Sequence, residues 1–255
     1  PAAWKDNKNF TIRAIDIAGN KGTETTVSVD IPEPNKVKNL TKTFTTDSVI
    51  LSWEEPDDTT NLQNSIIGYR IFRNFDTEHI AQVNATQITF KVDSTNFKRI
   101  NGIAGASFQV AAVYADPEFP NEGRASSNQE SIQVNIEVAP APDPTVSFEL
   151  DFAKVTWEEV TGSLPTMRYG VFETENSNAP IIEIDSREFI LKADFTEKSL
   201  VIRAFSAAYI NAVNENDADG KDLFIGEAEA FDVTRRNLTK PKKGRYEIGN
   251  EGGLG

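Results

Sequence analysis

The sequence contains no cysteine among its 255 residues, and this one absence removes several kinds of chemistry together. A chain without thiols forms no disulfide, offers no thiolate to a metal ion and has no cysteine nucleophile. The same absence leaves the redox compartment open, because a domain without disulfides folds in either kind of compartment.

Long apolar runs are missing as well. No stretch approaches the ~20 apolar residues that a membrane helix requires, and the first residues contain no apolar core of the signal-peptide kind. We therefore predict no membrane insertion. Because position 1 is not methionine, we also expect a processed product or a piece of something longer.

Positive charge is scarce, since 26 Lys and Arg residues stand against 39 Asp and Glu residues and the formal net charge is −13. An acidic chain repels a phosphate backbone, so nucleic-acid binding would need a local basic patch. The one candidate is KPKKGR at 240–245, beside a glycine-rich end. A short charge run of this kind is usually a solvated segment, so we predict no nucleic-acid partner.

Histidine is nearly absent, and the sequence offers no catalytic constellation. His79 is the only histidine, it falls in a predicted turn, and no G-x-S-x-G elbow accompanies it, so we place it on the surface. The pairs Glu54–Glu55 and Glu158–Glu159 suggest acid–base chemistry, but neighbouring strand residues point to opposite faces and cannot converge on one bond. We predict solvated strand ends, no catalytic residue and no cofactor.

The acidic stretch NENDADGKDLFIGE at 214–227 has the oxygen-rich composition of a calcium site. Three of its residues match positions of an EF-hand loop: Asp217, Asp219 and Gly220. The first ligand position would then be Glu215 and the twelfth would be Gly226, so the bidentate glutamate that closes such a site is out of register. We predict a polar loop with no metal ligands, and Asp222 belongs to the same loop.

Four N-x-S/T sequons could carry glycans if the protein is secreted. They begin at Asn9, Asn39, Asn84 and Asn237. Random placement of the same residues gives about three such sequons, so their number does not favour a glycosylated protein.

Strand-period alternation is the strongest positive signal, and it is clearest in residues 36–74. In the run from Ser48 to Glu54, the residues Val49, Leu51 and Trp53 fall on one face, because successive strand side chains point to opposite faces. The run 68–74 repeats the pattern, with Tyr69 and Ile71 facing inward. Two strands that each bury one face predict a shared core.

The succession NLT, DSVILSWEEP and GYRIFRN resembles the A, B and C strands of a fibronectin type III domain, with Trp53 and Tyr69 where that family keeps its core aromatics. Seven strands in about 100 residues are the expectation for such a sandwich. The remaining strands C′, E, F and G are expected at 79–83, 87–92, 107–115 and 131–138. The resemblance thus implies a domain at 34–138.

The same pattern recurs later in the chain, which supports the assignment independently. A third domain is expected at 139–234, and its B, C, F and G strands fall at 152–160, 167–173, 199–207 and 227–233. Trp157 takes the place of Trp53, and Phe231 with Val233 forms the expected inward pair of the last strand. One departure concerns the family's tyrosine corner, because the matching positions hold Lys8, Ala106 and Lys198.

Residues 10–16 and 25–31 predict a β-hairpin that resembles the closing F and G strands of a further domain. Its apolar face needs a facing sheet, since a two-stranded hairpin is marginal alone. That face comprises Phe10, Ile12, Ala14, Val27, Val29 and Ile31. We expect residues 1–33 to be the end of a first sandwich whose other strands lie outside this chain.

These observations predict an all-β protein of tandem immunoglobulin-like (fibronectin type III) β-sandwiches, the first one incomplete. Proline-rich connectors at 32–35 and 139–144 separate the domains, and residues 235–255 are expected to form a flexible tail or linker. Fold alone does not fix function.

Among families with cysteine-free tandems of this kind, the chain resembles the distal modules of a bacteriophage tail-tip or host-specificity protein, from a tail fibre or baseplate hub. The resemblance implies a non-catalytic structural and adhesive segment on a virion tail. Its partners would be copies of itself around the tail axis, other tail or surface proteins, and a host-surface receptor or glycan. Two alternatives stay open: spacer modules of a secreted bacterial polysaccharide-degrading enzyme, and the ectodomain of an animal-type receptor or other cell-surface adhesin.

Overall fold

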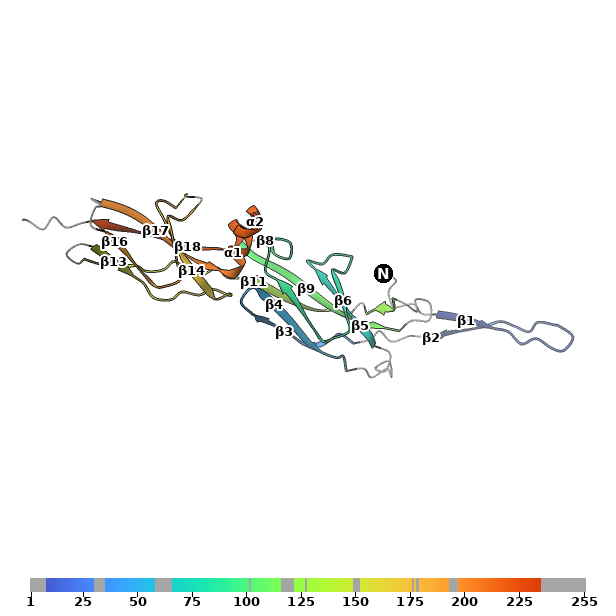
Figure 1. The fold of residues 1–255 in the computed structure, drawn as a ribbon. Coiled ribbons are helices and arrows are strands. Elements are labelled where there is room, and N and C mark those ends of the chain that lie inside the picture. Colours follow the sequence, from blue (N-terminus) through green and yellow to red (C-terminus); the bar gives the residue numbers. More distant parts are fainter. Residues whose placement is uncertain are drawn as a thin grey trace, which may run out of the picture.

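A computed structural model shows an elongated chain of antiparallel β-sheets with two short helices (Figure 1). The structure describes residues 8–29, 35–57, 66–100, 102–115, 122–126, 128–148, 152–175, 177, 179–192 and 197–234. The described parts form a hairpin at one end, a middle unit that runs from β3 to β11, and a distal unit that runs from β12 to β18. The predicted all-β class is therefore confirmed.

The hairpin consists of β1 (Lys8–Ile12) and β2 (Thr25–Val29), which pair in antiparallel register. It projects away from the rest of the molecule (Figure 1). Asp16 closes the tip, because its carboxylate accepts hydrogen bonds from the backbone amides of Ala18 and Asn20. The predicted hairpin is present, although its first strand ends at Ile12, before the predicted end at residue 16. Ile31, the last residue of the predicted second strand, lies outside the described residues.

The middle unit contains two sheets that share one core, in a sandwich-like arrangement. The smaller sheet has the order β3-β4-β7 and the larger one is built around β6-β5-β9, with β8, β10 and β11 also paired to β9. The strands are β3 (Lys38–Phe44), β4 (Ser48–Glu54), β5 (Ile66–Arg73), β6 (Ala81–Val83), β7 (Gln87–Lys91), β8 (Lys98–Ile100), β9 (Ile103–Tyr114), β10 (Arg124–Ala125) and β11 (Glu130–Ile136).

The core of the middle unit follows the predicted alternation. Val49, Leu51 and Trp53 of β4 are buried, and so are Tyr69 and Ile71 of β5. The rings of Trp53 and Tyr69 meet edge to face, with their centroids 5.3 Å apart. This arrangement suits the ring quadrupoles and connects β4 of the smaller sheet to β5 of the larger one.

The distal unit repeats this plan. Its smaller sheet has the order β12-β13-β16 and its larger sheet the order β15-β14-β17-β18. The strands are β12 (Thr145–Phe148), β13 (Phe152–Thr156), β14 (Thr166–Phe172), β15 (Ile182–Ile184), β16 (Glu188–Lys192), β17 (Glu197–Ser206) and β18 (Ile225–Thr234). Trp157 and Tyr169 meet at 5.1 Å and 70°, close to the 5.3 Å and 68° of the first pair. Phe231 and Val233 are buried, as predicted.

Two short helices stand where the sequence predicted a polar loop, so that prediction is wrong. They are α1 (Ala207–Asn214) and α2 (Ala218–Phe224), between β17 and β18. The acidic composition of 214–227 suggested a loop, but this stretch contains a capped helix start and two buried apolar residues, Leu223 and Phe224. The predicted tail at 235–255 and most of the connector at 32–35 lie outside the described residues.

Replacing either core tryptophan by alanine should lower the free energy of unfolding of its unit by about 3–5 kcal/mol, the usual cost of deleting a buried indole. Trp53 and Trp157 are only 4% and 5% exposed. Denaturant unfolding of the full chain measures the loss. Ile190→Ala on the exposed face of β16 is the matched control and should cost less than about 1 kcal/mol. A tryptophan variant as mild as this control would contradict the shared-core assignment.

Candidate functional site at the junction of the two units

The helical segment between β17 and β18 lies where the distal unit meets the middle unit (Figure 1). On the middle unit it meets the connection between β7 and β9, which contains the extra strand β8. Neither feature has a counterpart among the described residues of the other unit. The two departures from the repeat therefore contact each other, and we treat this junction as the candidate site.

Each helix of the junction starts at a side-chain cap. Ser206 ends β17 in an extended conformation, and its hydroxyl accepts a hydrogen bond from the Tyr209 amide at 3.4 Å. Asp217 caps α2 in the same way, because its carboxylate accepts from the Gly220 amide at 3.0 Å. Asn216 between the helices has a φ of 55°, a left-handed conformation that asparagine tolerates better than most residues. The turn is thus encoded locally.

A close approach at the second cap requires glycine. A β-carbon on Gly220 would lie 2.5 Å from the Asp217 carboxylate and 2.9 Å from the methyl group of Ala212. Because Gly220 lacks that carbon, α2 can fold back on α1 while Asp217 keeps its capping bond. The helical pair is therefore a compact unit.

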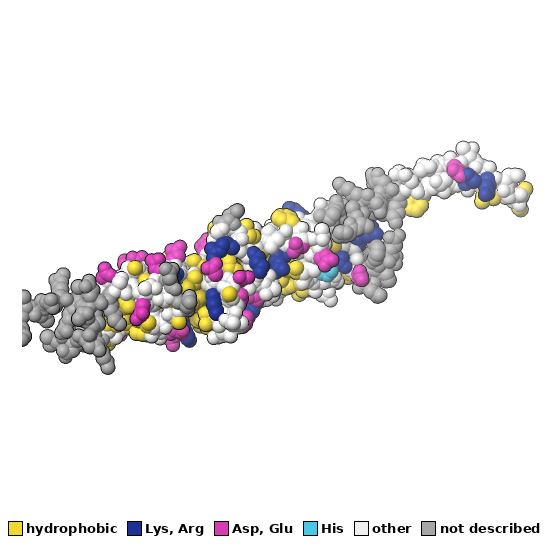
Figure 2. All heavy atoms as spheres, turned by 90° about the horizontal axis from the view of Figure 1, so that it is seen from above, with side chains coloured by type: hydrophobic (Ala, Val, Ile, Leu, Met, Phe, Trp, Pro, Cys, Tyr) yellow, Lys and Arg dark blue, Asp and Glu magenta, His cyan; other side chains and the backbone are white. Residues whose placement is uncertain are grey.

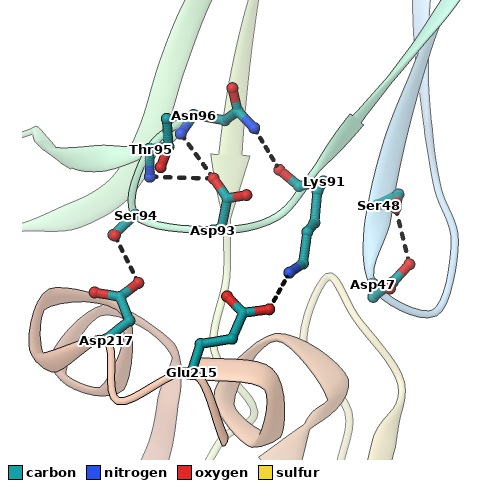
Figure 3. Close-up of polar contacts among 9 residues, drawn as sticks. All are labelled: Asp47, Ser48, Lys91, Asp93, Ser94, Thr95, Asn96, Glu215 and Asp217. Carbon is teal, nitrogen blue, oxygen red and sulfur yellow. Dashed lines mark hydrogen bonds and ion pairs between the residues drawn. The ribbon is translucent and has the colours of Figure 1, made fainter. Parts of the chain in front are cut away.

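The receiving loop on the middle unit is also held by its own side chains (Figure 3). The Asp93 carboxylate accepts from the amides of Thr95 and Asn96, at 3.1 and 2.9 Å. The Asn96 side chain in turn donates to the Lys91 carbonyl at 3.0 Å. Phe97 follows and is fully buried. Each side of the junction is thus held by internal contacts of its own.

Three pairs of described residues form polar contacts between the two sides, and Figure 3 shows two of these pairs. The Ser94 hydroxyl donates to the second carboxylate oxygen of Asp217 at 2.6 Å. The Lys91 ammonium lies 2.6 Å from the Glu215 carboxylate. The third contact pairs Arg99 of β8 with Asp222 of α2 at 3.1 Å, outside the view of Figure 3. Asp217 therefore caps its own helix and binds the neighbouring unit at the same time.

Apolar burial contributes more to the junction than these polar contacts do. One continuous hydrophobic cluster contains Phe97 and Ile136 of the middle unit together with Tyr209, Leu223 and Phe224 of the helical pair. A buried side chain of this size contributes about 1.5–3 kcal/mol, whereas an exposed ion pair contributes about 0.2–1 kcal/mol. The apolar cluster therefore supplies most of the attraction, and the polar contacts fix the orientation.

The proline-rich connector is hydrogen-bonded to the distal unit. The Ser163 amide donates to the Glu137 carbonyl at 2.8 Å, and the Ser163 hydroxyl accepts from the Glu137 amide at 2.9 Å. The Ala139 carbonyl accepts from Glu227 at the start of β18. A side chain on Gly162 would overlap the Glu137 carbonyl. The connector is thus a second attachment beside the helical pair.

An open cleft of about 460 Å³ remains beside α2, between the two units. Two arginines line it, and both are engaged by the protein. Arg99 pairs with Asp222, and Arg203 donates to the carbonyl of Gly226 at 2.9 Å. Lys and Arg side chains gather around the middle of the molecule, while acidic side chains spread over the distal unit (Figure 2). Both arginines at the cleft therefore make contacts within the chain.

Two charged groups of the junction have shifted pKa values. The Ser94 hydroxyl and the Gly220 amide bind the carboxylate of Asp217 and hold its pKa below the ordinary value of 3.8. The Glu215 carboxylate raises the pKa of Lys91 above 10.5. Each shift favours the charged form that makes the contact, so both contacts are fully formed near neutral pH.

The glutamate pairs and the histidine lie apart from the junction. Glu54 and Glu55 are exposed, and the Glu54 carboxylate lies 3.9 Å from the Lys38 ammonium. Burial and the nearby Glu55 carboxylate raise the pKa of Tyr69 to about 12. Glu158 and Glu159 are exposed at the end of β13. His79 is exposed and lies edge-on to the ring of Phe72. The structure brings none of these described residues together.

Two of the three acidic residues considered for calcium have other contacts. Asp217 caps α2 and binds Ser94, and Asp222 pairs with Arg99, whereas Asp219 is exposed in the first turn of α2. Within the described ranges, no group of three His, Cys, Asp or Glu side chains is placed to hold a metal ion. This stretch of sequence thus builds a contact between units.

The sequons are on exposed strands and turns where they are described. Asn9, Asn39 and Asn84 are exposed. Asn237 and the basic run 240–245 lie outside the described residues. In the described part of the chain, no helix is long and apolar enough to cross a membrane.

No protein-family model matches this chain, and no curated protein matches it in sequence.

Sequence reasoning found Asp217, Asp219 and Asp222 but assigned them to a loop, and it missed Lys91, Ser94 and Arg99 altogether. Two signals could have located the helices. Asp217 precedes an aspartate in the first helical turn, as in a helix start, and AAYINAV has apolar residues at helical spacing. Nothing local in the sequence indicates the partners on the middle unit, because these contacts join residues more than a hundred positions apart.

A double-mutant cycle on Ser94→Ala and Asp217→Ala should give a coupling free energy of about 1 kcal/mol, because the two side chains share one hydrogen bond between units. Asp217→Ala alone should cost about 1–2 kcal/mol, since it also removes the cap of α2. Unfolding of the full chain in denaturant gives both values.

The matched control cycle pairs Ser94→Ala with Asp219→Ala. Asp219 is exposed in the same helical turn and has no contact with Ser94, so this cycle should show no coupling. Equal coupling in the two cycles would mean that the bond between Ser94 and Asp217 does not link the units.

The contact should weaken in acid. Because the pKa of Asp217 is lowered in the folded protein, its contribution is complete above the unfolded value of 3.8 and is lost as the pH falls through the lower, folded value. Lys91 has a raised pKa, so its contribution is complete below 10.5 and is lost only as the pH rises through the folded value. The difference in unfolding free energy between the natural chain and Asp217→Asn should therefore shrink below about pH 4. A difference that stays constant from pH 7 to pH 2 would contradict the shift.

Proposed function

We propose that this chain is a non-catalytic structural segment that holds consecutive sandwich modules at a fixed angle in a larger extracellular or virion protein. The observation that carries the proposal is the junction. Two units with the same strand order are joined by features that break the repeat, namely α1 with α2 on one side and the β7–β9 connection on the other. A chain that served only as a flexible spacer would need no such contact.

We further propose that both units are fibronectin type III-like domains. Support comes from the strand order, because each unit pairs its first, second and fifth strands in one sheet, opposite a sheet built on the third strand. The edge-to-face Trp–Tyr pair at the same place in both units also supports the assignment. The domains would then span 34–138 and 139–234.

For the biological setting we propose a phage tail tip or tail fibre. A fixed angle between modules suits a part that must present a distal surface at a set position, and the cysteine-free composition is compatible with assembly in a reducing cytoplasm. The partners would be copies of the chain around the tail axis, other tail proteins and a host-surface receptor or glycan. The net charge of −13 disfavours nucleic acid as a partner.

An antibody raised against the 255-residue chain tests the setting. On purified virus particles from the source, electron microscopy should show label at the tail end and none on the capsid. Label on the bacterial surface without particles would favour the adhesin, and label on a secreted polypeptide that degrades polysaccharide would favour the enzyme spacer. Either of these results would overturn the virion assignment.

A further inference from the structure

The hairpin carries an apolar face that no other described part of the chain covers. Phe10, Ile12 and Val27 form this face, and they are 53%, 59% and 42% exposed. In the space-filling view the described hairpin projects freely at one end of the molecule (Figure 2). A two-stranded hairpin with a solvent-exposed apolar face is marginally stable in water, so we expect a partner to cover this surface.

The hairpin has the same cross-strand register as the closing strand pair of each unit. Phe10 lies opposite Val27, as Phe108 lies opposite Ile132 in the middle unit and Leu200 opposite Phe231 in the distal unit. Two positions further along, an aliphatic residue faces a polar one in all three pairs: Ile12 and Thr25, Val110 and Glu130, Ile202 and Glu229. The hairpin thus repeats the β9–β11 and β17–β18 pairs at these two positions of its apolar face.

The equivalent residues are buried in both units. Phe108 and Val110 in the middle unit, like Leu200 and Ile202 in the distal unit, have almost no exposed surface. What covers them is the opposite sheet, β3-β4-β7 or β12-β13-β16. The middle strand of that sheet carries small or aliphatic inward residues followed by a tryptophan, and the neighbouring strand adds Phe90 or Phe189. On the hairpin the matching positions are open, and β1 also has one edge with no described strand beside it, where β9 pairs with β5.

We propose that the face formed by Phe10, Ile12 and Val27 is a docking surface for a three-stranded sheet of the β3-β4-β7 kind, whose strands precede the hairpin in the same polypeptide. In both units the covering strands come before the closing pair in the chain, and the repeat applies the same order to the hairpin. The docking surface follows from the internal repeat and holds independently of the proposed function.

A second copy of the described chain does not fit this surface. Both sheets of the required kind already cover a closing pair in their own unit. Hairpin against hairpin would bury only three half-exposed side chains from each copy, about 100 Å² apiece at most. That area is well below the ~1,200 Å² of a stable specific interface.

The test adds such a sheet by fusion. A second copy of residues 34–98, which carries β3 to β7, is fused in front of residue 1 of the full chain. The link from this copy to β1 then resembles the natural link from β7 to β9. Backbone amide exchange over residues 9–12 and 25–28 should slow at least ~100-fold relative to the 255-residue chain, because a covered and paired strand opens far less often. A second fused chain carries residues 139–192 in the same place.

The control is the same pair of fused chains with Phe10→Ser and Ile12→Ser, in which exchange should stay as fast as in the 255-residue chain. Slow exchange in at least one fused chain but not in its control supports the docking surface. The proposal is overturned if neither fused chain slows exchange or if the controls slow it equally. It is also overturned if the unfused chain protects these amides, either as a monomer or, by sedimentation equilibrium, only as a dimer.

Discussion

Burial of the helical pair α1–α2 against the end of the middle unit is the interaction on which the arrangement of this molecule depends. Each sandwich has its own Trp–Tyr pair at its core. The facing ends of the two units, in contrast, share one hydrophobic cluster that runs through the junction. It contains Phe97, Tyr209, Leu223 and Phe224. The polar contacts at Ser94, Lys91 and Arg99 contribute less free energy, and all three form in the observed orientation of the two units.

The molecule combines a repeated unit with local changes that make one junction specific. The strand order and the Trp–Tyr pair recur in the middle and distal units, and the cross-strand register recurs in the hairpin as well. The differences lie in the connections between strands: α1 with α2 and the β7–β9 connection at the facing ends, and the short strand β10 beside the other end of β9. Changes of this kind leave the sandwich cores untouched, because loops and insertions at a domain end are tolerated while core packing is not. The result is a pair of similar modules with one defined contact.

The strands with one buried face could be predicted from the sequence, because alternation at period 2 reports burial directly. The run Ser48–Glu54 was predicted with its observed bounds, and the buried pair Phe231 and Val233 was identified from β18 alone. Short and mostly exposed strands such as β8, β12 and β15 carry no such pattern and were not predicted. The helices were missed because their charged residues suggested a loop. In the structure, Asp217 and Glu215 bind Ser94 and Lys91, which are distant in sequence.

The central claim is that the junction fixes the middle and distal units relative to each other. Residual dipolar couplings of backbone amides measure this directly, since they report the orientation of each unit in one aligned sample. If the claim holds, couplings from both units fit a single alignment tensor, and a Leu223→Ser variant, which opens the apolar cluster, requires two. Separate tensors for the two units of the natural chain would show that they reorient freely and would contradict the account.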